Sequence, residues 1–344
     1  MKILALTTSG FAPTHTDKLL SQIEYLNSFT DMQVIVKKDI PLADIEHLIM
    51  SQNFDCVYPS TVFKYSEDQK RILSFNKILF KILEYHHQAY IGSELFVHML
   101  LNDKALTNIR CGMSLPNLLL TKIFWTKRHK DALRYIANAP LPVIVKPNTL
   151  AASLGISKNS IAYTANDLAD IITKQFHAFP DVSELLLEHY LKDAKEFTVS
   201  VTGNGNKVLC NTTALVSRKN SYEIYSYTNK NLKEAERTLV YSSDIPLSLN
   251  IQLKRCATFL SQLLHTRDYS RFDFLVDTNE NIYLIDANSL PSLGTNYLLE
   301  YVNKHLVTQQ QILLLIFLVF CKRQGIPCSE YKKNIPDEIL KNIF

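Results

Sequence analysis

The fold is decided by one stretch of the chain: Tyr269-Ser-Arg-Phe-Asp-Phe-Leu-Val-Asp277, the turn Thr278-Asn-Glu-Asn281, and Ile282-Tyr-Leu-Ile-Asp-Ala-Asn288. Two runs of alternating apolar residues flank a polar turn, and this pattern predicts a β-hairpin. Asp286 and Asn288 are two residues apart on the second strand, so their side chains share one face of it. Antiparallel pairing can bring Asp273 of the first strand next to them.

These side chains predict a metal site on the hairpin. Two carboxylates and one amide offer only oxygen ligands, which suit Mg²⁺ when nucleotide phosphates complete its shell. Arg271 lies two residues before Asp273, so it shares that face and can reach a phosphate. The hairpin alone leaves an alternative open, in which the same residues form a solvated acidic face at the edge of a sheet.

Composition sets the broad class of the protein. The chain has 344 residues, more than one hydrophobic core usually serves, so roughly two or three domains are expected. Its net charge of +4 comes without a basic block, which argues against a nucleic-acid partner. The six cysteines are scattered without a CxxC pair, which indicates reduced thiols in a cytoplasmic protein. The apolar amino terminus is too short for a signal peptide and the apolar run 312–320 is too short to span a membrane, so a buried strand and a buried helix are expected.

The order of the predicted elements indicates an α/β fold. The first part of the chain has expected strands at 2–7, 32–36, 54–58 and 90–92 and expected helices at 18–29, 43–51 and 68–87. Such alternation predicts a parallel sheet covered by helices. A helix at 96–101 leads to a second unit with strands at 117–123 and 142–146 and helices at 130–137 and 166–179. A third unit has strands at 184–189, 196–201 and 207–211, a helix at 249–264 and the hairpin. The predicted domains are 1–105, 106–182 and 183–344.

Two groups of residues indicate phosphate binding. The strand Pro142-Val-Ile-Val-Lys-Pro147 precedes a loop of small residues that runs to Gly155. Backbone N–H groups in such a loop can approach phosphate oxygens, and Lys146 adds a charge. Lys104, after an apolar helix, offers a second charge. An ordinary strand exit and a surface lysine are the alternatives.

Two further groups indicate a nucleotide pocket with a cover. Glu188 and Glu196 flank a short connection between two strands, where they could bind an adenine amino group and ribose hydroxyls. The polar segment 218–231, rich in Tyr, Asn and Lys, has the composition of a loop that closes over a site and excludes water. Exposed glutamates and a flexible surface loop are the alternatives.

Taken together, these motifs resemble the ATP-grasp superfamily, and most closely its D-alanine–D-alanine ligases. The resemblance rests on the order of five motifs: Asn102-Asp-Lys104; Pro142-Val-Ile-Val-Lys-Pro147; Leu187-Glu188 followed by Glu196-Phe-Thr198; Arg271-Phe-Asp-Phe274; and Asp286-Ala-Asn-Ser-Leu-Pro291. Each motif is weak alone, but five motifs in the family's order and spacing are specific. The resemblance implies an ATP-grasp fold preceded by a parallel α/β, or pre-ATP-grasp, domain.

The resemblance also implies a role for each matching position. The implied ATP-binding residues are Lys104, Lys146, Ser153, Gly155, Glu188, Leu191 and Glu196, with Glu188 and Leu191 at the adenine and Glu196 at the ribose. The implied ligands of Mg²⁺, or of Mn²⁺ as an alternative, are Asp273, Asp286 and Asn288. The implied catalytic residues are Arg271, Ser153 and Lys230. Such enzymes phosphorylate a substrate carboxylate, and an amine then attacks the acyl phosphate.

The amino-acid half of the chain departs from the family. The turn 7–15 lacks the family's glutamate, and 62–69 replaces a His-Gly motif. Ala152, Asn231 and Ser292 replace a serine, a tyrosine and a glycine. The expected function is therefore ATP- and Mg²⁺-dependent ligation of a small carboxylate to an amine, with amino acids or a peptide as substrates and a homodimer as the implied assembly. The alternatives are a divergent D-alanine–D-alanine ligase and a nucleotide-binding protein without ligase activity.

Overall fold

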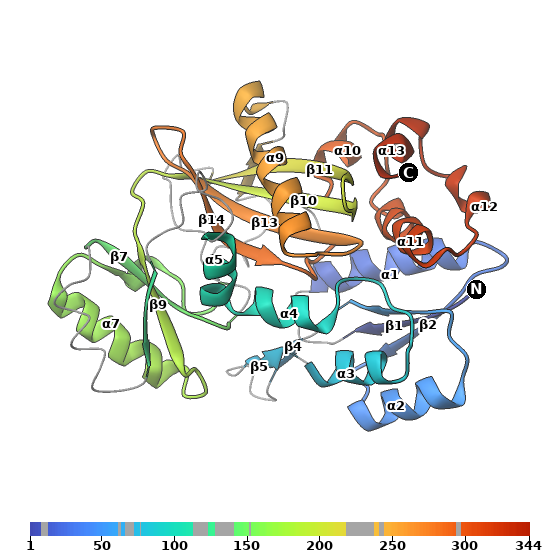
Figure 1. Ribbon diagram of the computed structural model, residues 1–344, viewed down its shortest axis with the longest axis horizontal. Helices are drawn as coiled ribbons and strands as arrows, with labels where there is room; N and C mark the ends of the chain where they lie inside the picture. Colours follow the sequence, from blue (N-terminus) through green and yellow to red (C-terminus); the bar gives the residue numbers. More distant parts are fainter. Residues whose placement is uncertain are drawn as a thin grey trace.

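The structure is a computed structural model that describes residues 1–7, 13–60, 63–65, 72–75, 77–112, 123–127, 141–150, 153–217, 237–240, 244–293 and 297–344. In these ranges the strands form four sheets, of three, two, four and five strands. Figure 1 shows helices arranged around these sheets, with α5 between the four-stranded and the five-stranded sheet.

The amino-terminal part is a parallel sheet with helices on both sides. Its strand order is β2-β1-β3, from β1 (Lys2–Thr7), β2 (Gln33–Lys38) and β3 (Cys56–Pro59). Helix α1 (Pro13–Asn27) covers one side, and α2 (Leu42–Ser51) and α3 (Lys77–Tyr85) lie on the other (Figure 1). Strand β1 is apolar from Ile3 to Leu6 and almost fully buried, as expected for a central parallel strand. The predicted parallel sheet is confirmed.

One predicted helix of this part is wrong at residues 72–75. The chain expected to be helical over 68–87 contains the strand β5 (Ile72–Phe75), which pairs antiparallel with β4 (Phe63–Tyr65), and helix α3 begins only at Lys77. A short apolar run supports either a strand or a helix, and here pairing with a neighbouring strand decides between them. The predicted strand at 90–92 is reduced to a single bridge between Tyr90 and Val57.

The four-stranded sheet has the order β6-β9-β7-β8. Its strands are β6 (Ile123–Lys127), β7 (Val143–Pro147), β8 (Ile161–Ala162) and β9 (Glu184–His189), and a 3-10 turn, η1 (Lys158–Ser160), precedes β8. Helix α7 (Ala165–Ala178) packs Leu168 and Ile172 against Val143, Val145 and Leu187. The predicted strand at 117–123 and the observed strand β6 have only Ile123 in common, and β6 runs on to Lys127. The remainder of that range and the predicted helix at 130–137 lie outside the described residues.

The five-stranded sheet is antiparallel in the order β12-β11-β10-β13-β14. Its strands are β10 (Lys195–Asn204), β11 (Lys207–Ser217), β12 (Arg237–Val240), β13 (Tyr269–Val276) and β14 (Ile282–Asn288). One face packs Phe197, Phe272 and Phe274 against Leu253 and Leu260 of α9 (Leu247–Leu263), and the whole cluster is buried. Because side chains alternate along a strand, the opposite face carries the polar residues of the sheet. The predicted hairpin is confirmed as β13 and β14.

Short helices connect these parts. Helices α4 (Leu95–Asn102) and α5 (Lys104–Gly112) link the amino-terminal part to the four-stranded sheet, and α10 (Leu299–Asn303), α11 (Gln311–Gln324), α12 (Ser329–Lys332) and α13 (Asp337–Ile343) complete the chain. In α11 every residue from Ile312 to Cys321 is buried in the core shared with the amino-terminal sheet, which confirms the predicted buried helix. None of the helices in the described ranges has the length and apolarity needed to cross a membrane.

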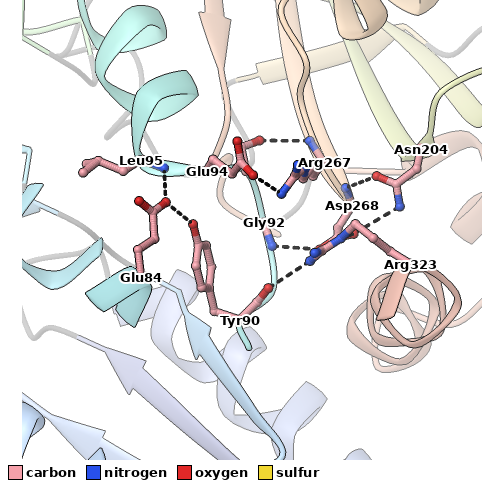
Figure 2. Close-up of polar contacts among 10 residues, drawn as sticks. Glu84, Tyr90, Gly92, Glu94, Leu95, Asn204, Arg267, Asp268 and Arg323 are labelled. Carbon is pink, nitrogen blue, oxygen red and sulfur yellow. Dashed lines mark hydrogen bonds and ion pairs between the residues drawn. The ribbon is translucent and has the colours of Figure 1, made fainter. Parts of the chain in front are cut away.

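A buried ion pair joins three of these parts (Figure 2). The carboxylate of Asp268, which is inaccessible to solvent, accepts hydrogen bonds from Nε of Arg323 at 2.8 Å and from Nη2 at 2.7 Å. It also accepts from the backbone N–H of Gly92 at 2.9 Å and from Nδ2 of Asn204 at 3.2 Å. Helix α11, the segment between α3 and α4, and strand β10 are thereby fixed to Asp268, the residue that precedes β13.

Candidate active site

The hairpin brings four polar side chains onto one face. Asp273 on β13 is directly opposite Asp286 on β14, and Arg271 is directly opposite Asn288. Directly paired residues in an antiparallel ladder point to the same side of the sheet. The register shifts between Asp273 and Phe274, so the pairing of the two carboxylates is set at a bulge. The prediction that these residues share a face is confirmed.

Asp273 is held by its neighbours. Arg271 donates to both of its carboxylate oxygens, from Nε at 2.9 Å and from Nη2 at 2.8 Å. The hydroxyl of Thr198, opposite Asp273 on β10, donates to Oδ1 at 2.6 Å. Sequence reasoning missed Thr198, although its place two residues after Glu196 puts both on one face of β10. The hydrogen bond from Thr198 orients the carboxylate of Asp273. On the neighbouring strand, Oδ1 of Asn288 accepts a hydrogen bond from the backbone N–H of Leu290 at 2.9 Å.

The oxygen atoms of this face are suited to a hard cation. Asp273, Asp286 and Asn288 offer carboxylate and amide oxygens, and neither sulfur nor imidazole ligands stand among these three. Among the residues that the structure describes, no three or more His, Cys, Asp or Glu side chains gather into a metal site. Because Mg²⁺ takes an octahedral shell and is usually held by one or two carboxylates together with substrate phosphates, two carboxylates and an amide fit a metal that arrives with phosphate oxygens. Their role as metal ligands stays a prediction.

A second polar face lies on the four-stranded sheet. Glu188 on β9 pairs in register with Ile144, two residues before Lys146 on β7, so the lysine and the glutamate are diagonal neighbours on one face. They form a buried ion pair, with side chains 8% and 3% exposed. The second carboxylate oxygen of Glu188, Oε1, is buried and has no hydrogen-bond partner in the described part of the chain. A buried acceptor of this kind requires a donor, and a nucleobase amino group would supply one.

Lys104 connects the two polar faces. It is the first residue of α5, and its Nζ donates to the backbone carbonyl of Leu150 at 2.6 Å and to that of Asn148 at 3.3 Å. Burial lowers the pKa of Lys104, the carboxylates of Asp286 and Glu188 act to raise it, and the charge of Lys146 acts to lower it. One lysine is thus within electrostatic reach of β14, β9 and β7, which lie far apart in the sequence.

The loop after β7, which the sequence makes rich in small residues, turns sharply at Ser153 and Gly155. Ser153 and Gly155 both have positive φ angles, of 59° and 74°. A Cβ atom on Gly155 would lie 2.8 Å from Cδ of Pro147 and 2.7 Å from Oε1 of Gln175, so no larger residue fits there without movement. The carbonyl of Gly155 accepts from the hydroxyl of Ser160 at 2.9 Å, which fixes the end of the turn.

The remaining predicted residues are placed as follows. Glu196 is half-buried on β10. It lies two residues before Thr198, so both side chains are on the face that carries Asp273. Leu191 lies half-buried in the connection between β9 and β10. Lys230 and the segment 218–231 lie outside the described residues. Sequence reasoning did not single out Asn148, which is 1% exposed and accepts a hydrogen bond from the backbone N–H of Ala105 in α5.

Comparison with known proteins agrees with this arrangement. Residues 111–311 match the family model described as D-ala D-ala ligase C-terminus. A D-alanine--D-alanine ligase of Leuconostoc citreum (strain KM20) is 24% identical over 297 residues, which are 84% of this chain and 74% of that protein. One of Helicobacter acinonychis (strain Sheeba) is 28% identical over 233 residues, 64% of this chain and 61% of that protein. This chain therefore matches only about three fifths of the length of the second relative.

A solved structure shares the overall fold. The D-alanine--D-alanine ligase from Bacillus anthracis, complexed with ATP, matches 94% of this chain and 99% of its own with a TM-score of 0.68. At 15% identity this likeness shows the fold alone, and the fold is the ATP-grasp fold predicted from the sequence. Since the family model covers more than half of the 344 residues, the chain belongs to the D-ala D-ala ligase C-terminus family.

Proposed function

We propose that this protein is an ATP- and Mg²⁺-dependent ligase that joins a small carboxylate to an amine. The observation that carries the proposal is the position of Lys104. Its Nζ donates to the carbonyls of Asn148 and Leu150 after β7, and α5 lies between the two sheets (Figure 1), where the charges of Asp286, Lys146 and Glu188 all act on it. Two lysines beside a pair of facing carboxylates suit a ligand that carries both phosphate and metal charge. The family's named members, D-alanine--D-alanine ligases, support the same chemistry.

Each residue then has a defined task. Bound ATP with Mg²⁺ supplies a phosphoryl group that turns a substrate carboxylate into a good acyl donor for an amine. Lys104 and Lys146 bind phosphate oxygens as point charges. Oε1 of Glu188 accepts a hydrogen bond from the base, and Glu196 binds the ribose hydroxyls.

The metal and the transferred group are held from the hairpin. Asp273, Asp286 and Asn288 supply oxygen atoms to Mg²⁺. The guanidinium of Arg271, on the same face, neutralises charge that develops on the phosphoryl group. The turn from Ser153 to Gly155 presents backbone N–H groups to the phosphates and helps exclude water.

The substrates belong to the finer part of the proposal. The turn at 7–15 lacks the glutamate expected for binding D-alanine, and 8–12 lies outside the described residues. We therefore expect an amino acid or a peptide other than D-alanine alone. A divergent D-alanine–D-alanine ligase is the second candidate, favoured by the names of the relatives. A binding protein without ligase activity is disfavoured, because a scaffold does not require Arg271, Asp273, Asp286 and Asn288 together.

The proposal is tested by ADP release. The purified protein is incubated with ATP and Mg²⁺ and with mixtures of amino acids and small carboxylates, one mixture at a time. We expect release to depend on one carboxylate and one amine together, and D-alanine alone to stimulate it poorly. Efficient synthesis of D-alanyl-D-alanine, with a KM in the usual range of about 1 μM to 1 mM, would favour the second candidate. No stimulation by any mixture, with ATP bound, would refute ligase activity. The homodimer stays a prediction that analytical ultracentrifugation can test.

A further inference from the structure

One buried side chain joins the strand that carries Lys146 to the helix that begins with Lys104. Asn148, at 1% exposure, accepts a hydrogen bond at Oδ1 from the backbone N–H of Ala105 at 3.0 Å. Its Nδ2 donates to Oδ1 of Asp103 at 3.0 Å, just before α5. The amide therefore binds both the residue before Lys104 and the residue after it.

The same residue also binds the neighbouring strand. Nδ2 of Asn148 donates to Oε2 of Glu184 at 3.2 Å, and its backbone N–H donates to the carbonyl of Glu184 at 3.1 Å. Its own carbonyl accepts from the backbone N–H of Lys104 at 3.5 Å and from Nζ at 3.3 Å. Asn148 thus contacts the end of β7, the start of β9 and the start of α5, and both ends of its amide are bonded.

The two lysines require such a tie because their charges repel. The charge of Lys146 acts against protonation of Lys104, so the distance between them must be imposed by the fold. A lysine side chain alone has too many rotamers to impose it. The backbone of α5 can do so, provided that its first turn is fixed against the four-stranded sheet. Asp103, which accepts from the backbone N–H of Leu106 at 2.9 Å, fixes that turn and is itself held by Asn148.

We propose that Asn148 is a positioning residue for phosphate binding, which holds Lys104 and Lys146 at the spacing that one polyphosphate requires. This inference rests on the proposed function, since that function assigns both lysines to ATP. A residue that only stabilises the fold is the competing explanation. The two differ in one respect, because a positioning residue acts through Lys104 and loses its effect when Lys104 is absent.

A double-mutant cycle separates the two explanations. The cycle uses Asn148→Ala, Lys104→Ala and the double variant, with affinities measured by calorimetric titration of a non-hydrolysable ATP analogue with Mg²⁺. Each single variant should lose about tenfold in affinity, the effect of one or two hydrogen bonds. The double variant should be no more than about twofold weaker than Lys104→Ala alone. Adenosine, which lacks phosphates, should bind all four proteins equally.

A charge exchange adds a test of rescue. Asn148→Asp keeps the size of the side chain but places a carboxylate beside Asp103 and Glu184, so the affinity for the ATP analogue should fall about tenfold. Adding Asp103→Asn restores one amide–carboxylate pair and should recover part of the affinity. The control is Asn166→Ala. It removes the same kind of side chain from an exposed position of α7, the helix that covers the four-stranded sheet, and should leave the affinity for the ATP analogue unchanged.

Every outcome decides between the explanations. Additive losses in the cycle would overturn the proposal, as would equal losses for adenosine and for the ATP analogue. If Asn148→Ala does not fold, the cycle is run with Asn148→Asp under the same criterion. Wild-type protein that binds no ATP analogue would refute both this inference and the proposed function. Wild-type protein that binds the analogue but ligates nothing would refute the proposed function while the cycle still decides the inference.

Discussion

Asp286→Asn is the sharpest test of the hairpin. The change keeps the size of the side chain and removes one negative charge from the face shared with Asp273 and Asn288. Asp273 is already bonded by Arg271 and Thr198, so Asp286 is the carboxylate of the pair more available to a cation. We therefore expect its loss to weaken binding of the metal–nucleotide complex and to have little effect on the fold.

The expected change in stability without ligand is small because two effects oppose each other. Asp286 faces the carboxylate of Asp273, and like charges opposite one another in a sheet destabilise it. Asp286 also favours the protonated form of Lys104. Removing the charge relieves the first effect and loses the second, so the free energy of unfolding should change by no more than about 0.5 kcal/mol.

The expected change with ligand is larger. An ATP analogue with Mg²⁺ at a concentration of 100 Kd stabilises the wild type by about 2.7 kcal/mol. If the variant binds about tenfold more weakly, the same concentration stabilises it by about 1.4 kcal/mol. With an unfolding entropy of about 2.1 cal/mol/K per residue, 1 kcal/mol corresponds to about 1.4 °C for 344 residues that unfold together. The ligand-induced rise in Tm should therefore fall from about 4 °C to about 2 °C.

The assay is thermal unfolding with and without the ATP analogue and Mg²⁺, together with ADP release. Glu280→Gln is the matched control, because it removes one charge from the exposed turn of the same hairpin. Turnover of Asp286→Asn should fall at least about a hundredfold, since metal ions supply several kcal/mol in phosphoryl transfer. Equal rises in Tm for wild type and variant, with ADP release intact, would show that the hairpin is structural and not a metal site.

Three further predictions concern individual side chains. Glu196→Ala should weaken binding of the ATP analogue about ten- to a hundredfold in calorimetric titration, because a methyl group cannot replace a carboxylate at the ribose; unchanged affinity would make Glu196 a surface residue. His98 is buried, and burial lowers its pKa to about 3. Between about pH 3 and pH 6.5 this imidazole is therefore protonated in the unfolded chain and neutral in the folded chain. The free energy of unfolding should drop by about 2 kcal/mol from pH 8 to pH 5 on this account, and His98→Asn should lose that slope in urea titrations. Arg323→Met leaves the buried carboxylate of Asp268 without its cation and should cost about 3–5 kcal/mol in urea unfolding, with partial recovery when Asp268→Asn is added.

The sequence by itself determined the elements whose signals are local. Alternating apolar residues set the hairpin, and the spacing of two residues between Asp286 and Asn288 set their common face. The unbroken apolar run of α11 set a buried helix. The short apolar run at 72–75 was misjudged, because strand and helix are both compatible with it until a pairing strand is known.

Only the tertiary structure decided how these pieces form one site. The charges of Asp286 and Glu188 act on Lys104 because α5 lies between two sheets, and no spacing along the chain encodes that arrangement. The pairing of Lys146 with Glu188 depends on the register of β7 against β9, which is fixed by the apolar core on the other face of that sheet. The side chain of Asn148 bonds two distant segments at once, the start of α5 and the start of β9, so no local pattern in the sequence could reveal these contacts. The periodicity of apolar residues indicates which face of a strand or helix a residue occupies. Contacts between distant segments arise only when the strands and helices pack together.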